Sequence, residues 1–218
     1  MNEVGSALQG LAPLGDWSGL PLDLPALFAL AAGLGWAAGL RLYALVFVLG
    51  LLGQFGVQLP GGLTVLSHPL VLGLSGVMLV VEFLADKLPW LDSLWDGLHT
   101  FIRIPAGAAL AAALAGGHSE ASALALALLG GTVAAGTHFA KAGARALINT
   151  SPEPASNIAA SSAEDLLFAG GLWALFAHPA VFLVGLAIFL VIATLIIWMA
   201  WRLLSRLFKL RRPRPGGS

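Results

Sequence analysis

Long, almost uninterrupted apolar stretches limit what this chain can fold into more than any other feature. The clearest cover residues 25–54 and 178–201, and each provides about the 20 apolar residues that a helix needs to cross a bilayer. Of the 218 residues, 58% are hydrophobic and only 10% are charged, whereas soluble domains carry roughly 25% charged residues. The sequence therefore predicts an integral protein of the cell membrane, surrounded by the lipid bilayer.

The chain has room for about five or six such helices with short connections. We expect an all-α, polytopic helical transmembrane bundle in which some helices are broken or re-enter the membrane. Its expected parts are an N-terminal lead-in over residues 1–24, a single transmembrane domain over 25–204 and a basic tail over 205–218. The expected helices cover residues 25–54, 67–88, 89–104, 121–148, 151–177 and 178–201, and residues 105–115 form an apolar segment too short to span alone.

Charge and composition exclude several classes of function. The formal net charge is zero, which argues against a nucleic-acid partner. The chain has no cysteine, so disulfides, thiolate nucleophiles and cysteine-bound metals are excluded. Residues 1–24 contain no Lys or Arg, and a cleaved signal peptide is therefore not expected. The tail is rich in Arg, and the positive-inside rule predicts a cytoplasmic C-terminus.

A stripe of ionisable residues marks the helix expected over residues 89–104. At about 100° per residue, Asp92, Asp96, His99 and Arg103 fall within about 60° of the helix circumference. Together with Asp86 nearby, they could bind a divalent cation or relay protons. The alternative is an interfacial helix whose polar stripe is merely hydrated.

A second stripe lies on the helix expected over residues 121–148. His138, Lys141, Arg145 and Asn149 again share about 60° of the circumference. Its cations could hold an anionic solute or a lipid phosphate. Alternatively, they could pair with the acids of the first stripe and with Glu82, which would neutralise both rows.

The segment between the next two helices could also form a site. Residues 149–154 are rich in proline, and Ser151 followed by Pro152 and Glu153 predicts a helix start. Irregular backbone at membrane depth is tolerated only where protein buries it or water reaches it. Glu153 and Asn157 could bind an ion there, although an ordinary loop fits the sequence equally well.

Arg41 lies near the middle of the first apolar stretch. An arginine in hydrocarbon costs at least about 2.5–3.5 kcal/mol on insertion scales, so it needs a partner. We expect a carboxylate from another helix, either Glu82 or Glu164. An ion pair between helices is the favoured reading.

Two pairs of short segments resemble each other. Residues 37–41 resemble residues 134–138, and His68-Pro69 resembles His178-Pro179, each opening an apolar helix. Ser67 is expected to cap the first of these helices. Weak internal symmetry with broken helices, as in an inverted repeat, is typical of transporters. Chance resemblance is the alternative in a chain so rich in Ala, Leu and Gly.

Several short motifs occur together in one order along the chain. They are Gly39-Leu40-Arg41-Leu42-Tyr43, Glu82-Phe83-Leu84-Ala85-Asp86-Lys87, Asp92-Ser93-Leu94-Trp95-Asp96 with His99-Thr100-Phe101, and Thr137-His138-Phe139-Ala140-Lys141 with Asn149-Thr150-Ser151-Pro152-Glu153-Pro154. Over about residues 25–200 the chain resembles the bacterial membrane-protein family catalogued as domain of unknown function 4126. The resemblance implies a membrane protein and supplies no mechanism.

Three functions fit these residues. We favour a transporter or channel-like permease for a small solute or ion, with proton coupling as one form, because ionisable groups inside membranes mark pathways. The alternatives are a membrane-embedded enzyme acting on a lipid or isoprenoid phosphate, and a structural protein whose stripes are salt bridges. No Ser/His/Asp or zinc signature supports an enzyme, and the substrate, cofactor, metal and association of copies stay open. All three readings expect the acidic and basic rows to meet inside the bundle.

Overall fold

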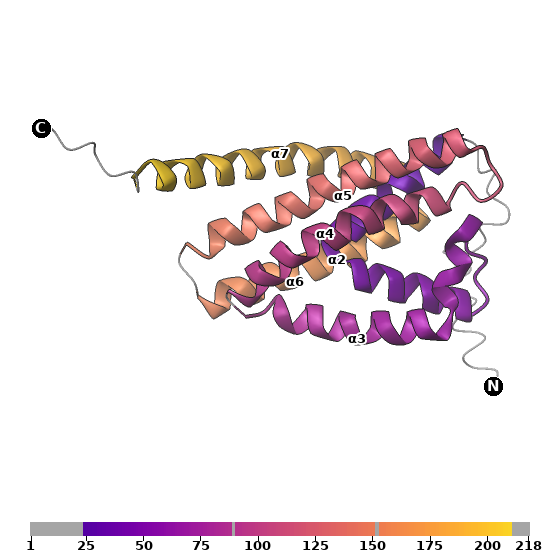
Figure 1. Ribbon diagram of the computed structural model, residues 1–218, viewed down its shortest axis with the longest axis horizontal. Coiled ribbons are helices and arrows are strands. Elements are labelled where there is room, and N and C mark those ends of the chain that lie inside the picture. The colour runs from indigo at the N-terminus through magenta and orange to yellow at the C-terminus, as the bar shows by residue number, and fades with distance from the viewer. Residues whose placement is uncertain (1–23, 89, 151–152, 211–218) are drawn as a thin grey trace, which may run out of the picture.

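The computed structural model describes residues 24–88, 90–150 and 153–210, and this part of the chain is all-α. Its seven helices are α2 (Leu24–Gln54), the 3-10 helix η3 (Gly61–Ser67), α3 (Pro69–Ala85), α4 (Leu91–Ala113), α5 (Glu120–Ile148), α6 (Pro154–Ala177) and α7 (Pro179–Leu210). They form one elongated bundle, in which α3 lies along one side and α7 extends past the end of the other helices (Figure 1). The all-α bundle predicted from the sequence is thus present.

The helix α2 reverses direction at Arg41, whose backbone leaves the helical conformation with φ −144° and ψ 80°. Before this point, α2 passes Leu175 at Gly33 and reaches the other end of α6 at Arg41. After it, α2 runs back along α3 and meets Ser67 at Gly53. Both ends of α2 therefore lie at the same end of the bundle, and Arg41 is its apex (Figure 1). Residues 25–54, expected as the first span, therefore form two helical segments that meet at a break, as the prediction of broken helices allows.

The first half of α2 packs closely against α5 through glycine. A Cβ atom at Gly35 would overlap the carbonyl group of Gly130, and one at Gly39 would lie 2.6 Å from the carbonyl oxygen of Ala134. Glycine lets two helix backbones approach this closely in a membrane. This contact brings residues 37–41 beside residues 134–138, the two segments that resemble each other. Their relationship as a repeat stays a prediction.

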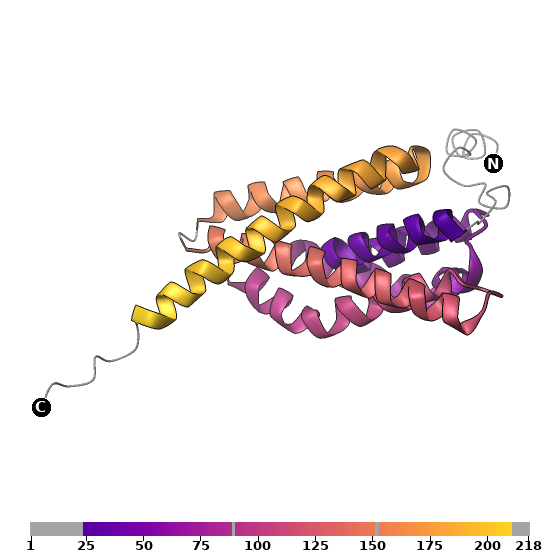
Figure 2. The same ribbon diagram turned by 90° about the horizontal axis from the view of Figure 1, so that it is seen from above.

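The helices α6 and α7 form a hairpin that covers one side of the bundle, and α7 crosses the other helices obliquely (Figure 2). Many large apolar side chains of α7 point outward, among them Val184, Val191 and Leu195, which are each more than half exposed. Such an outer face suits contact with lipid. Helices with such an apolar outer surface are typical of a membrane protein.

Three helices in the described part of the chain are long and apolar enough to cross a membrane. They cover Ala26–Gln54, Glu120–Ile148 and Pro179–Arg206, and η3 with α3 adds a fourth if this pair, bent by 73°, counts as one span. The predicted five or six spans are more than this test of length and composition finds. The number of spans therefore stays a prediction.

Proline 105 does not end a helix, contrary to the expectation from the sequence. The helix α4 continues through it to Ala113, because its second half packs directly on α5. A Cβ atom at Gly107 would lie 2.6 Å from that of Ala134, and Ala111 is fully buried. The free energy gained from this packing outweighs the loss of the one backbone hydrogen bond that proline removes from a helix.

Helix starts also differ in detail from the sequence prediction. His68, and not Ser67, caps α3, since its Nδ1 atom accepts a hydrogen bond of 3.2 Å from the backbone N–H of Leu70. The helix α6 begins at Pro154, and Ser151 and Pro152 lie outside the described residues. Proline at the first position matches the known preference of helix starts.

Candidate functional site

The two predicted polar stripes meet inside the bundle. On α4, Asp92, Asp96, His99 and Arg103 are all buried, as the shared helix face required. On α5, His138, Lys141 and Arg145 are buried, and the cap residue Asn149 is half-buried. Opposite charges from α2, α3 and α6 complete one network, which we call the ion-pair network. It consists of Arg41, Glu82, Asp86, Asp92, Asp96, Arg103, Lys141, Arg145, Glu164 and Asp165.

Arg103 forms the deepest part of the ion-pair network. Its guanidinium donates to Glu82 Oε1 at 2.6 Å and to Asp96 Oδ1 at 2.9 Å. All three side chains are almost fully buried. Arg103 and Asp96 both belong to α4, so the pair with Glu82 is the one that ties α4 to α3 by charge.

Lys141 lies at the centre and contacts carboxylates from three other parts of the chain. Its Nζ atom is 3.0 Å from Asp86 Oδ2, 3.4 Å from Glu164 Oε2 and 3.7 Å from Asp96 Oδ1. Burial by itself raises the pKa of the Asp86 carboxyl, but the charges of Lys141 and Arg41 outweigh burial and hold that pKa below its usual value. Asp86 is therefore an ionised anchor between two cations.

Arg41 enters the network from the apex of α2. Its Nη2 atom lies 3.2 Å from Asp86 Oδ2 and 2.7 Å from Asp165 Oδ1, and it donates to Ser161 Oγ at 3.3 Å. The partners predicted from the sequence, Glu82 and Glu164, are wrong. The reversal of α2 explains the difference, because it places the arginine between the end of α3 and the first half of α6.

Arg145 closes the network toward the start of α6. Its guanidinium makes two parallel hydrogen bonds of 3.1 Å to the carboxylate of Glu164. It also donates to Asn157 Oδ1 at 3.1 Å, and it lies 3.8 Å from Asp92 Oδ2. Paired bonds of this kind fix the geometry of an arginine as well as its charge. Asn149 adds a hydrogen bond to each carboxylate oxygen of Asp92, both of 3.2 Å.

The two buried histidines border the network without joining a carboxylate. His138 Nε2 lies 2.7 Å from Thr100 Oγ1, and its Nδ1 lies 3.4 Å from Arg103 Nη1. His99 bonds the hydroxyl of Tyr43 at 3.0 Å and stacks on Trp95. His138 therefore lies between a charged and a neutral polar group, whereas His99 contacts the neutral groups of Tyr43 and Trp95.

The segment before α6 does not form the ion site that the sequence suggested. Glu153 is exposed, and its carboxylate makes no capping hydrogen bond. Asn157 is fully buried, but its side-chain oxygen accepts from Arg145 and its nitrogen donates to Asn149. The amide therefore belongs to the ion-pair network and is not directed at a separate ion.

A metal site is also not assembled from the first stripe. In residues 24–88, 90–150 and 153–210, no three His, Asp or Glu side chains are arranged to hold a metal ion. Asp92 bonds Asn149, Asp96 bonds Arg103 and His99 bonds Tyr43, so their polar atoms point to different partners. A shared helix face alone does not make side chains converge on one point.

Carboxylates outnumber cations in the ion-pair network of the described chain. Six acids meet four cations in this network. Lys87 joins the rim of the network through a 3.3 Å hydrogen bond to Ser161, and the acids remain in excess even when this lysine is counted. The contacts are continuous from Glu82, which is fully buried, to Asp165, whose side chain is 36% exposed. The network thus links the interior of the bundle to its surface.

Several buried polar atoms of the network have no hydrogen-bond partner within the described residues. They are Nε and Nη1 of Arg41, Nε of Arg103, Oε2 of Glu82, Oδ2 of Asp96 and, beside the network, Oγ1 of Thr137. Each such atom costs about 1–3 kcal/mol if it stays unpaired. The site therefore retains donors and acceptors that water or a polar solute could satisfy.

Sequence reasoning left Asp165, Ser161, Lys87, Tyr43 and Thr100 out of the site. Asp165 and Ser161 were recognisable as neighbours of Glu164 on α6, at adjacent and helical spacing. Tyr43, the one tyrosine of the chain, carried no periodic signal. Its contact with His99 depends on the reversal of α2 two residues earlier.

Comparison with known proteins identifies a family for this chain. The sequence model of the family described as "Domain of unknown function (DUF4126)" matches residues 28–202. Among the curated proteins and among the solved structures, none matches the chain.

Proposed function

The chain belongs to the DUF4126 family, and we propose that it is a permease that moves a small solute or ion together with protons through the ion-pair network. The support comes from the residues of the network, because the family carries no assigned activity. One observation carries the proposal: a continuous row of charged groups with an excess of carboxylates runs from the buried Glu82 to the surface at Asp165.

Excess carboxylates suit proton binding. Two carboxylates that share one cation are relieved when one of them takes a proton. Lys141 is shared in this way by Asp86, Asp96 and Glu164. Glu164, whose side chain is 15% exposed, is the acid of these three nearest the surface, so a change there can alter which acid holds the lysine. This exchange is the coupling step that we propose.

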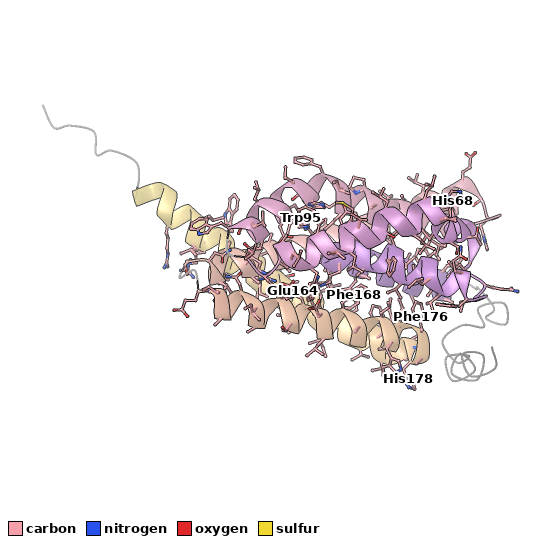
Figure 3. The ribbon with its side chains drawn as sticks, turned by 90° about the horizontal axis from the view of Figure 1, so that it is seen from below. His68, Trp95, Glu164, Phe168, Phe176 and His178 are labelled. Atoms are coloured by element: carbon pink, nitrogen blue, oxygen red, sulfur yellow. The ribbon has the colours of Figure 1, made fainter. Side chains whose placement is uncertain are left out.

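The first half of α6 is the part best suited to move. Its fully buried residues are Asn157 and Ser161, which are polar, whereas the second half buries Phe168, Leu172 and Leu175. Figure 3 shows Glu164 near the middle of this helix and Phe176 and His178 at the end that leads into α7. Apolar packing thus anchors one half, while ion pairs and hydrogen bonds hold the other.

Those polar contacts can open when a substrate or proton competes for them. Release of Glu164 from Arg145 and Lys141 would loosen the first half of α6. Once Asp165 and Ser161 also leave Arg41, the unpaired groups of Arg41 would be exposed to the surface. Two arrangements of one packed element are what a transport cycle requires. We propose that α6 opens and closes the network in this way.

Reconstitution into liposomes tests the proposal. The purified protein is placed in vesicles that contain a pH-sensitive dye, and proton movement is followed under an imposed pH gradient, with and without a panel of small ions and solutes. We expect protein-dependent proton movement that one class of solute increases. Asp96→Asn should reduce it to the level of empty vesicles, because Asp96 links Arg103 to Lys141.

A matched variant separates this result from a general loss of charge. Glu120 is an exposed acid at the start of α5, outside the network, and Glu120→Gln should retain full proton movement. Both variants must elute as the original protein does on size exclusion in detergent. Proton movement no greater than in empty vesicles, with every solute of the panel, would refute the permease.

A structural role is the second candidate, and the number of direct ion pairs favours it. Every arginine and lysine within the described network contacts at least one carboxylate. If these pairs only stabilise the bundle, exchanging the charges of Arg145 and Glu164 should restore the stability that either single change removes. A permease should lose transport in that double variant even when the fold is restored.

A further inference from the structure

A separate, apolar cavity of ≈ 200 Å³ lies between α2, α6 and α7. Its lining is almost wholly hydrocarbon and aromatic, and it shares no residue with the ion-pair network. Trp36 forms its floor, with Phe182 edge-on at 5.5 Å and Phe189 at 6.2 Å between ring centres. The cavity follows α7 from Val181 to Phe189, which corresponds to about 12 Å at 1.5 Å per residue.

Two glycines give the cavity its shape. Gly171 lets the indole of Trp36 lie against α6, because a Cβ atom there would overlap the indole ring. Gly185 borders the cavity from α7, and a Cβ atom there would meet nothing within 4 Å. Glycine at 185 therefore leaves space open that any larger side chain would occupy.

The cavity is continuous with the apolar outer surface of the bundle. Val181 and Leu167 line it and are 64% and 43% exposed, respectively, on helices whose outer faces are apolar. The lining offers a guest in this cavity almost no polar surface. Cavities of about 150 Å³ with such linings stay dry and take up apolar guests.

We propose that this cavity binds one acyl chain of a phospholipid from the surrounding bilayer. The chain enters from the lipid-facing side and lies along α7 against Trp36, beneath the turn at His178. Its ligand is identified by three properties of the site: an elongated shape, an almost wholly apolar lining and an opening on the lipid-facing surface. The inference does not depend on transport through the ion-pair network.

Fluorescence quenching by brominated phospholipid tests this assignment, since bromine on an acyl chain quenches tryptophan only at contact. Two full-length variants are compared in bilayers of phosphatidylcholine brominated in the middle of the chain. One retains Trp36 as the only tryptophan, and the other retains Trp198, which is 55% exposed on α7. Trp36 is 3% exposed, so protein alone would shield it. We expect Trp36 to be quenched as strongly as Trp198.

Filling the cavity supplies the matched control. Gly185→Leu in the Trp36 variant should remove the quenching, whereas Gly170→Leu, on an exposed and open position of α6, should leave it unchanged. Trp36 that is not quenched, or quenching that persists in Gly185→Leu, would overturn the proposal. Native mass spectrometry of the unmodified protein gives an independent reading. We expect one retained phospholipid, and a retained free fatty acid or isoprenoid instead would also overturn it.

Discussion

Asp96 on α4 and Lys141 on α5 face each other inside the bundle, with 3.7 Å between Oδ1 and Nζ. Each also has a closer partner, Arg103 for the aspartate and Asp86 for the lysine. This pair joins the deep part of the ion-pair network to its centre. Because Asp96 touches two cations and Lys141 touches three carboxylates, a change at either residue is expected to affect the whole network.

Removing the central cation should strongly destabilise the protein. Lys141→Met leaves Asp86, Asp96 and Glu164 without a shared partner, and loss of one member of a buried ion pair costs about 3–5 kcal/mol. Thermal unfolding in detergent measures the effect. Arg206→Met, at an exposed position of α7, should change stability by no more than about 0.5 kcal/mol. Equal unfolding temperatures for the two variants would contradict the central role of Lys141.

The two acids that bind Arg41 should differ in their contribution. Asp86 is fully buried and shared with Lys141, whereas Asp165 is 36% exposed. Asp165→Asn should cost about 0–1 kcal/mol, as exposed pairs do, and Asp86→Asn should cost several times more. Chemical unfolding of both variants under one condition checks the order. The reverse order would mean that Asp165 is the principal partner of Arg41.

Stability should fall at acidic pH partly through Asp86. Its pKa in the folded protein lies below the usual value, since the charges of Lys141 and Arg41 outweigh the effect of burial. The ionised form therefore stabilises the fold fully above the usual aspartate pKa of about 3.9, and this contribution is lost as the pH falls below it. Unfolding temperatures between pH 6 and pH 3 should decline less in Asp86→Asn than in the original protein. Parallel declines would exclude this role.

The close approach of α2 and α5 should make Gly35 intolerant of a side chain. Gly35→Ala places a methyl group against the carbonyl group of Gly130, so we expect loss of stability and a shift of α2. Gly136→Ala, where a Cβ atom meets nothing within 4 Å, should be neutral or stabilising, by about 0.5–1 kcal/mol. Unfolding temperatures of the two variants in the same detergent give the comparison. A Gly35→Ala protein as stable as Gly136→Ala would show that the two helices can separate freely.

Opening of α6 should expose Ser161, which is fully buried in the closed arrangement. The chain has no cysteine, so Ser161→Cys provides a single thiol. Its reaction with a charged thiol reagent in liposomes should be faster when Glu164→Gln removes the paired bonds to Arg145. Glu153→Gln, at an exposed acid on the same helix start, is the matched control and should leave the rate unchanged.

A buried position elsewhere distinguishes local opening from unfolding. Leu126→Cys on α5 lies among apolar side chains and should stay unreactive in both backgrounds. Similar acceleration at both positions would mean that Glu164→Gln loosens the entire bundle. No acceleration at Ser161→Cys would remove α6 from the proposed cycle.

The sequence alone determined that the chain is a helical membrane protein and which helix faces are polar. Helical spacing placed Asp92, Asp96, His99 and Arg103 on one face, and all four are buried. Lipid requires ionisable groups to turn inward, so a periodic row of charges predicts a buried one. The same reasoning applied to His138, Lys141 and Arg145, which are buried on α5.

Only the tertiary structure decided which charges pair. Arg41 binds Asp86 and Asp165 because α2 reverses at Arg41. Such a break cannot be predicted from the periodicity of an almost wholly apolar stretch. Likewise, α4 continues through Pro105 because it packs on α5. Periodicity describes one helix at a time, whereas an ion pair depends on distances of a few ångströms between helices. These distances follow from packing, above all where glycine lets α2 approach α5.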